Sequence, residues 1–348
     1  MTFLAIVADC GGTNTRLQLY SIESNQLLTL VSNKKAPGKL LFEKEYANEA
    51  YLAAKKTFTH IYLEFMKSSH HASSKVHVMS IGVAGPVNSN RVVFTNNGWT
   101  IDGTSLESEL KINRVTLMND FVANGYGLLT LDFGAGRGLR ASEPEDVRVI
   151  QDAPRVPGAP MACVGAGTGL GEVFLTNPNT FCPTRLTTPG AALGFKGDDN
   201  YTAYPTEGGH AEFAPRTVLE FEMLEWLMVK YSQRHRVSVE RVVSGRGLAN
   251  IFEFLCQHKE YKGQVGAALK AQFDAATDLQ GKVVAEGDAA GDPVAAKAME
   301  IFIGAYGSEA GVAALKYIPF GGLFLAGGLT PKNLHHIEPK GGVGSQHE

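Results

Sequence analysis

The sequence predicts an α/β fold made of two related domains, and three observations support this prediction. The chain has 348 residues, a length that suits about two domains of ordinary size. Short β-rich runs alternate with segments of helical periodicity, as in folds where helices cover a sheet. A strand, a Gly/Thr-rich turn and a second strand also occur near the start of each half, which indicates a weak internal duplication.

The first half begins with a predicted antiparallel meander. Phe3–Asp9 is a β-rich apolar run, Arg16–Tyr20 alternates polar and apolar residues, and Leu27–Val31 follows after a polar turn. Runs of this kind, separated by turn residues, are typical of strands joined by tight turns. We therefore expect three neighbouring strands at one side of a sheet.

Helices and further strands follow the meander. In segment 58–65 the apolar residues recur at i, i+3, i+4 and i+7, the spacing of an amphipathic helix. Val76–Ala84 and Val115–Met118 predict strands because each ends at turn residues, and 121–130 is expected to be a helix. Crossover helices between such strands would complete the first sheet.

The second half starts with the same order of elements as the first. Met161–Val164 predicts a strand that runs into a Gly-rich turn at 165–169, and Glu172–Leu175 predicts the returning strand. Two helices and a late buried strand are expected further along, at 217–233, 285–316 and Gly321–Ala326.

The composition argues against several classes of function. The formal net charge is -3 and the pI is about 6.4, so nothing indicates the basic face that nucleic acids or anionic membranes require. No apolar run reaches the roughly 20 residues of a membrane helix, and MTFLAIVAD reads as a first strand, not a signal peptide. The cysteines form no CxxC pattern, so we expect reduced thiols and a cytoplasmic protein.

Two Gly-rich turns are candidate phosphate-binding loops. Backbone N–H groups in a tight turn bind phosphate well when small residues let the chain approach closely. Asp9–Asn14 and Gly165–Gly169 both offer this, and Asp9 is placed to hold Mg²⁺ directly or through water. Each turn alone is equally well explained as a plain hairpin. Because a predicted strand and not a helix follows Gly169, a Rossmann site is excluded, and no P-loop motif is present.

Asp120 is a candidate general base. It follows Asn119 at the end of a predicted strand, where a carboxylate would lie at the C-terminal edge of the sheet. In phosphoryl transfer to an alcohol, a carboxylate there orients the hydroxyl and accepts its proton. The alternative is that this pair caps the helix predicted at 121–130, since Asn and Asp are favoured at that position.

The segment Glu207–Glu212 places polar side chains around flexible backbone. Carboxylates such as Glu207 can accept hydrogen bonds from sugar hydroxyls. A structural histidine is the alternative for His210, and a zinc site is not supported because HExxH is absent.

Taken together, the motifs resemble those of the bacterial-type glucokinases, which belong to the actin-like ATPase superfamily. The resemblance covers residues 3 to about 333 and rests on motifs in the family's order: DCGGTNTR (9–16), GVAGPV (82–87), TNNGW (95–99), MNDF (118–121), GAGTGLG (165–171), EGGHAEFAP (207–215), VERVVSGRGL (239–248) and FLAGGL (324–329). The cysteine cluster of the related ROK sugar kinases does not follow His210, so that branch is excluded and no zinc is expected.

The resemblance implies a role for individual residues. Asp120 corresponds to the catalytic base, which accepts the proton of the glucose 6-hydroxyl as the enzyme transfers the ATP γ-phosphoryl group to that oxygen, with Mg²⁺ as cofactor. The residues that correspond to glucose contacts are Asn119, Glu207, His210 and Glu240, and Asn96 and Gly85 line the sugar pocket. The residues that correspond to nucleotide contacts are Asp9, Cys10, Gly11, Gly12, Thr13, Asn14, Gly165, Gly167, Thr168, Gly169, Gly327 and Gly328, with Ser244–Gly247 nearby.

The implied fold is two RNase H-like α/β domains with an intervening cleft. A small domain is expected at 1–118, a large domain at 119–333 and a disordered tail at 334–348. Members of the family continue further after the AGG motif than this chain does, so we expect a shortened form of the protein. A homodimer is one candidate assembly. The sequence offers no physical explanation for the presence of segment 190–204.

Two alternatives to a glucose kinase remain open from sequence. One is a kinase for another hexose, because discrimination among hydroxyls depends on small differences in placement. The other is a catalytically weak sugar-binding regulatory protein, which the short C-terminus favours and the intact Asp120 disfavours.

Overall fold

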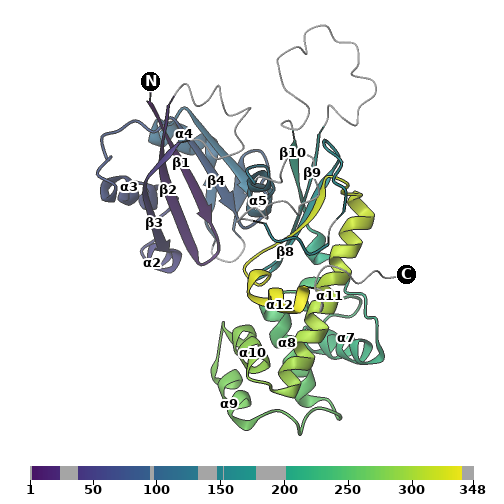
Figure 1. Ribbon diagram of the computed structural model, residues 1–348. Helices are drawn as coiled ribbons and strands as arrows, with labels where there is room; N and C mark the ends of the chain where they lie inside the picture. Colours follow the sequence, from purple (N-terminus) through teal and green to yellow (C-terminus); the bar gives the residue numbers. More distant parts are fainter. Residues whose placement is uncertain are drawn as a thin grey trace. The chain divides into compact units, whose positions relative to one another are not determined.

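A computed structural model describes residues 2–23, 38–94, 98–131, 147–151, 153–177 and 201–338. The described residues form two compact units, 2–131 and 147–338 (Figure 1). The boundary therefore lies after α5 (Asp120–Leu128), not between residues 118 and 119 as the sequence suggested, because α5 packs against β4 and β7 of the first unit.

The first unit is built on a five-stranded sheet in the order β3-β2-β1-β4-β7. The strands are β1 (Thr2–Cys10), β2 (Asn14–Glu23), β3 (Lys39–Ala47), β4 (Val78–Val83) and β7 (Arg114–Asn119). β1, β2 and β3 pair antiparallel, whereas β4 and β7 run parallel to β1. The predicted meander is thus confirmed in topology.

The third strand of the meander differs from the prediction. It is β3, which the sequence analysis did not predict, and Leu27–Val31 lies outside the described residues. Charged residues of β3 face polar partners across the strand pair, Glu45 opposite Arg16 and Glu43 opposite Gln18. Charge on an edge strand discourages pairing with other chains, and it also hides the strand from a hydrophobicity pattern.

Helices cover the first sheet, and α3 (Phe58–Ser68) confirms the amphipathic segment. Its residues Ile61 and Phe65 are buried against Ile6 and Leu17 of the sheet, in a core that also includes α4 (Gly103–Leu110). The remaining elements of this unit are α2 (Asn48–Ala53) and the hairpin β5 (Arg91–Val93) and β6 (Thr100–Asp102).

The second unit repeats the strand order of the first. Its sheet is β10-β9-β8-β11, formed by β8 (Met161–Ala166), β9 (Leu170–Thr176), β10 (Thr202–Thr206) and β11 (Gly322–Ala326). As in the first unit, three strands pair antiparallel and the next one, β11, lies parallel to the first. The internal duplication is therefore visible as a repeated topology. β8 is fully buried, but β11 is only partly buried and lies at the edge among the described strands, which corrects the expectation of a buried strand.

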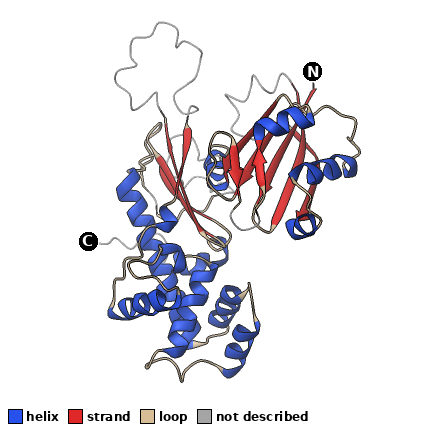
Figure 2. Ribbon diagram, turned by 180° about the vertical axis from the view of Figure 1, so that it is seen from behind, coloured by secondary structure: helices blue, strands red, loops and turns tan. Residues whose placement is uncertain are grey.

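Helices form the rest of the second unit (Figure 2). Their core contains large buried side chains, including Phe252, Phe273 and Phe302. The helices are η2 (Gly208–His210), α7 (Val218–Lys230), η3 (Val239–Arg241), α8 (Gly245–Gln257), α9 (Ala267–Ala275), α10 (Gln280–Ala289), α11 (Pro293–Tyr317), η4 (Pro331–Asn333) and α12 (Leu334–Ile337). α7 confirms the helix predicted at 217–233. None of the described helices, the 25-residue α11 included, has the length and hydropathy to span a bilayer.

The single helix expected at 285–316 is wrong, because α10 and α11 are separate. Asp292 caps α11: its carboxylate accepts hydrogen bonds of 2.9 Å from the backbone N–H groups of Val294 and Ala295. Pro293 occupies the first turn, where its missing N–H costs no hydrogen bond. The Asp-Pro pair is thus a helix-start signal inside an apolar periodic stretch.

The start of the expected disordered tail is ordered as α12. His336 Nε2 lies 2.7 Å from Asp288 Oδ2, which connects α12 to α10. Residues 339–348 lie outside the described part of the chain.

Candidate functional site

The C-terminal edge of the first sheet collects the candidate residues of the first unit. Parallel pairing sets Cys10 opposite Val83 and Val83 opposite Asn119. Asp9 and Asp120 therefore belong to strand ends that lie two strands apart, on either side of β4. Gly82 of β4 lies between them, opposite Asp9 in register and close to the Cα of Asp120.

The first glycine turn, Cys10–Asn14, joins β1 to β2 and is fixed from outside by Asn48. The N–H of Gly11 donates to the carbonyl of Asn14 across the turn (2.9 Å). Asn48, fully buried at the start of α2, donates from Nδ2 to the Gly11 carbonyl (2.8 Å) and accepts from Thr15 Oγ1 (2.7 Å). Its own N–H donates to the carbonyl of Thr13 (2.8 Å). The turn is thus held in one shape while Gly12 and Thr13 stay exposed.

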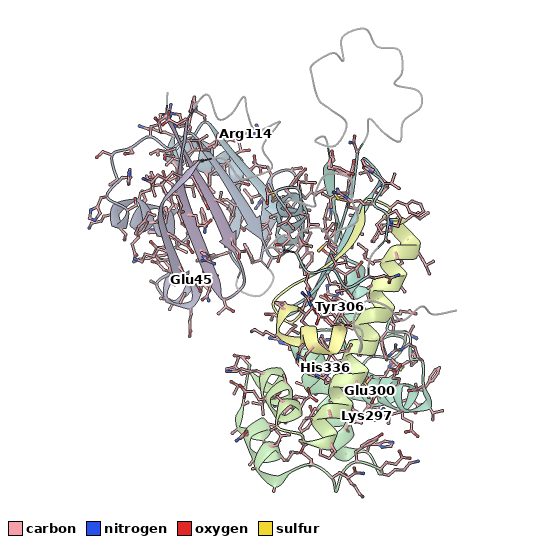
Figure 3. All side chains as sticks on the ribbon, viewed as in Figure 1. Glu45, Arg114, Lys297, Glu300, Tyr306 and His336 are labelled. Atoms are coloured by element: carbon pink, nitrogen blue, oxygen red, sulfur yellow. The ribbon has the colours of Figure 1, made fainter. Side chains whose placement is uncertain are left out.

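The side chains beside this turn are charged and solvent-accessible. Partial desolvation raises the pKa of the Asp9 carboxyl, Arg16 across the strand pair opposes this, and Glu45 adds to it. Asn14 donates from Nδ2 to Glu45 Oε1 (2.7 Å), so its amide is engaged by Glu45, labelled in Figure 3. Burial raises the pKa of the Cys10 thiol to about 11, so this cysteine is a neutral part of the core.

Asn119 caps α5, as the structural alternative anticipated. Its Oδ1 accepts from the N–H groups of Phe121 (2.9 Å) and Val122 (3.3 Å), and its Nδ2 donates to the Gly85 carbonyl (3.4 Å). Asp120, half-buried, is the first residue of the helix, and its Oδ1 accepts from the same Phe121 N–H (2.9 Å). The cap thus fixes the position of Asp120 as the first residue of α5.

The second glycine turn is Gly167–Gly169, shorter than predicted, because Gly165 and Ala166 are part of β8. The N–H of Gly167 donates to the carbonyl of Gly169, and the N–H of Gly245 donates to the carbonyl of Gly167, both at 2.8 Å. β9 follows it directly, so the strand–turn–strand prediction is confirmed.

Glu240 connects the second glycine turn to the sugar-site candidates. Its Oε2 accepts from the N–H of Leu170 (2.9 Å), immediately after the turn. Glu240 belongs to η3, and the chain around η3 is bonded to the chain around η2: Val239 N–H donates to the Ala211 carbonyl (2.8 Å). Glu207, which precedes η2, and His210, its last residue, therefore lie in the same region as Glu240. Glu207 Oε2 and His210 Nε2 are 3.7 Å apart and both side chains are more than half exposed.

Gly208 packs directly on a residue that the sequence analysis missed. A Cβ on Gly208 would overlap both carboxylate oxygens of Glu172 in β9, so any side chain at this position would force the Glu172 carboxyl to shift. Glu172 is buried and reads in sequence as one polar position in an alternating strand, which carries no signal of this contact.

Tyr306 fixes the end of β11 and the turn that follows it. Its hydroxyl contacts the carbonyls of Val164 and Ala326 (3.1 and 3.2 Å) and Thr330 Oγ1 (2.9 Å); it is labelled in Figure 3. Gly327 has φ of 81° and packs against the backbone of Ala166, so a side chain there would be strained. The Gly327–Gly328 turn is thereby held against the end of β8.

Among the described residues, one cluster has the composition of a metal site. Ligand atoms of Asp288, His335 and His336 lie within 4.8 Å of one another. The 2.7 Å between His336 Nε2 and Asp288 Oδ2 is a hydrogen bond, shorter than the roughly 3.3 Å between two ligands of a tetrahedral zinc. We interpret the cluster as the attachment of α12.

The candidate residues thus form one set in each unit. The first unit holds Asp9, the first glycine turn, Asn119 and Asp120; the second holds the second glycine turn, Glu207, His210, Glu240 and the Gly327–Gly328 turn. Asn96 lies outside the described residues. Thr15, Asn48, Glu172 and Tyr306 support these sets, and only their burial in the folded chain identifies them.

Comparison with known proteins gives the same family along the whole chain. The sequence profile described as Glucokinase matches residues 6–187 and 184–341. A glucokinase of Nostoc sp. is 34% identical, with 96% of this chain and 87% of that protein covered. A glucokinase of Synechocystis sp. is 36% identical, with 97% and 86% covered.

Solved structures show the same fold. The glucokinase of an Antarctic psychrotroph has a TM-score of 0.63 at 21% identity and covers 96% of this chain and 85% of its own. The glucokinase of Balamuthia mandrillaris, solved in complex with glucose, has a TM-score of 0.64 at 18% identity, with 97% and 84% covered. These neighbours are sugar kinases of the actin-like ATPase fold, so the expected fold class is confirmed.

We predict that Asn48→Ala destabilises the first unit by about 2–3 kcal/mol, because the Gly11 carbonyl and the Thr15 hydroxyl lose their buried partner. The measurement is denaturant unfolding followed by a probe in the first unit. Asn14→Ala is the control: it removes one exposed bond, and its effect should stay below about 0.5–1 kcal/mol. Equal effects of the two substitutions would contradict the role given to Asn48.

Proposed function

The chain belongs to the glucokinase family, and we propose that Asp120 is the general base with which it phosphorylates glucose. The protein is an ATP-dependent hexose kinase that transfers a phosphoryl group from ATP to glucose. The position of Asp120 carries the proposal for the base. It is a half-buried carboxylate at the C-terminal edge of the parallel strands, on the same edge as Asp9 and the first glycine turn.

In the proposed step, Asp120 accepts the proton of the glucose 6-hydroxyl. The sugar oxygen forms a bond to the γ-phosphorus of ATP, the bond from that phosphorus to the bridging oxygen breaks, and ADP leaves. Backbone N–H groups of the two glycine turns and of Gly327–Gly328 stabilise the charge on the phosphates. Asn119 caps the start of α5 and so fixes the backbone position from which Asp120 acts.

Asp9 fits the magnesium ion that ATP chemistry requires. It offers an accessible carboxylate oxygen at a strand end, and Mg²⁺ in phosphate sites takes one or two carboxylates with water and phosphate oxygens. Bound there with ATP, the ion would neutralise charge on the phosphates. Burial raises the pKa of the Asp9 carboxyl, and Arg16, opposite Asp9 in β2, partly offsets this by favouring the ionised form that such binding needs.

The sugar contacts are proposed for Asn119, Glu207, His210 and Glu240. Glu207 and His210 support this because they are accessible and lie beside each other. Glu240 has one oxygen engaged by Leu170, which leaves the other for a sugar hydroxyl and couples sugar binding to the second glycine turn. We place the enzyme in the cytoplasm, since Cys10, Cys163 and Cys256 are free thiols. The oligomeric state stays a prediction.

We predict that Asp120→Asn lowers kcat about 10²–10⁴-fold while glucose binding is nearly unchanged, because the amide orients the hydroxyl but takes no proton. The measurement is a coupled ATPase assay with and without glucose, beside a glucose titration of heat stability. Asp102→Asn is the matched control, an Asp at another helix start of the same unit. More than about half of the wild-type kcat in Asp120→Asn would remove Asp120 as the base. Heat stabilisation by glucose without turnover in the wild type would indicate a sugar-binding regulator.

We predict that Glu207→Gln and Glu240→Gln differ in their effect on ATP. Each weakens a charged acceptor of a sugar hydroxyl and should raise the KM for glucose roughly tenfold or more. Glu240→Gln should also raise the KM for ATP, because Glu240 accepts from the N–H that follows the second glycine turn. Steady-state kinetics with both substrates measure this, with the exposed Glu225→Gln as control. A Glu207→Gln enzyme with only its KM for ATP changed would move Glu207 out of the sugar site.

A further inference from the structure

Two buried carboxyl groups of the second unit, Glu172 and Glu309, carry oxygen atoms that have no hydrogen-bond donor among the described residues. Glu172 of β9 is 1% exposed and Glu309 of α11 is 6% exposed. Among the described residues, neither oxygen of Glu172 and not Oε1 of Glu309 has a hydrogen-bond partner. Buried polar atoms are nearly always partnered, and an isolated buried carboxylate is costly. The pair therefore needs an explanation.

One shared proton provides it. The two carboxyl groups are close enough for the charge of Glu309 to act on Glu172, and two carboxyl groups can share a hydrogen bond only if one of them is protonated. Burial first, and then the charge and hydrogen bond of Glu309, raise the pKa of Glu172 to about 7, although Lys316 on α11 favours its ionised form. A carboxyl–carboxylate pair thus exists below neutral pH, and two carboxylates face each other above it.

Glu172 packs against the sugar-site segment, and Glu309 lines a cavity beside the chain that follows this segment. Gly208, between Glu207 and Gly209, packs on the Glu172 carboxyl, and its N–H donates to Thr206 Oγ1 (3.0 Å). Glu309 lines a cavity of about 90 Å³ together with Lys316, Val239 and the residues 211–214. Through Gly208, the segment that carries Glu207 and His210 is therefore packed against Glu172.

We propose that Glu172 and Glu309 are positioning residues, which share one proton and so hold Glu207–His210 in its glucose-binding arrangement. The proposal rests on the sugar-contact role proposed for Glu207 and His210. Loss of the shared proton places a second negative charge in a buried site and breaks the bond between the two groups. Repulsion then displaces β9 from α11 or draws water between them, and Gly208 moves with Glu172.

The pH window follows from the groups around the pair. Those that face it are Lys316 and Tyr317 of α11 and Glu212, which lines the same cavity as Glu309. Burial raises the pKa of the Tyr317 hydroxyl, so Tyr317 stays neutral through this range. Because the pKa of Glu172 is raised on folding, its contribution to stability is complete below the ordinary value of a glutamate. That contribution is lost as the pH rises through about 7.

The test compares the wild type with Glu172→Gln between about pH 6 and pH 8.5, a range that brackets the titration of the pair. In the wild type we expect the midpoint of thermal unfolding to fall as the pH rises and the KM for glucose to increase about fivefold, with a smaller change in kcat. Glu172→Gln supplies a permanent amide donor to Glu309, so both trends should disappear while the low KM is kept. Glu309→Gln is the second variant and should behave alike.

The control is Glu300→Gln. Glu300 is an exposed residue of α11, the helix that carries Glu309; it pairs with Lys297 and is labelled in Figure 3. This variant should keep the wild-type pH dependence. The proposal is overturned if Glu172→Gln and the wild type show the same pH trend in unfolding and in the KM for glucose. It is also overturned if Glu172→Gln changes the KM values for glucose and ATP equally at every pH, which indicates a purely structural role. The unfolding measurement needs no sugar, so it separates failure of the shared proton from failure of the glucose-contact assignment.

Discussion

Parallel pairing of β1, β4 and β7 is the constraint on which the rest of the first unit depends. In a parallel ladder the strands end at the same edge, so one register decides which side chains meet there. The register that opposes Cys10 to Val83 and Val83 to Asn119 sets the first glycine turn and Asp120 at that edge. A shift of the strand register by one residue would turn Asp9 into the core and Cys10 toward solvent, and the candidate site would no longer form.

The second unit has the same strand order but supports its turn in a different way. In the first unit a buried amide, Asn48, satisfies the backbone of the turn with local bonds. In the second unit Glu240, about 70 residues away, accepts the N–H that follows the turn. A repeated topology therefore carries two unlike arrangements. The charged carboxylate of Glu240 makes the second turn sensitive to any ligand that binds Glu240, whereas the neutral amide of Asn48 holds the first turn in one shape.

Sequence patterns predict those parts of the fold that depend on local chemistry. The strands flanking both turns and the helix at 58–65 follow from periodicity, and the motif resemblance names Asp120 and Glu240. The edge strand β3 was not predicted because its charged residues interrupt the alternation of polar and apolar residues that marks a strand. The break between α10 and α11 was not predicted because the apolar periodicity continues across it, although the pair Asp292-Pro293 indicates the start of a new helix. The role of Glu172 could not be predicted from sequence, because it depends on the proximity of Gly208 and Glu309, which are distant in sequence.

Glu240, a proposed acceptor of glucose hydroxyls, also accepts the N–H that follows the second glycine turn, so the proposal couples glucose binding to phosphate binding at that turn. A ligand that binds one arrangement of this region better than another shifts the protein toward it, and linkage makes the effect on ATP and on glucose reciprocal. Calorimetric titration of a non-hydrolysable ATP analogue, with and without saturating glucose, measures this most directly. The account predicts that glucose tightens binding of the analogue, by about 5- to 150-fold for ordinary coupling energies. Equal affinities in the two titrations would contradict it.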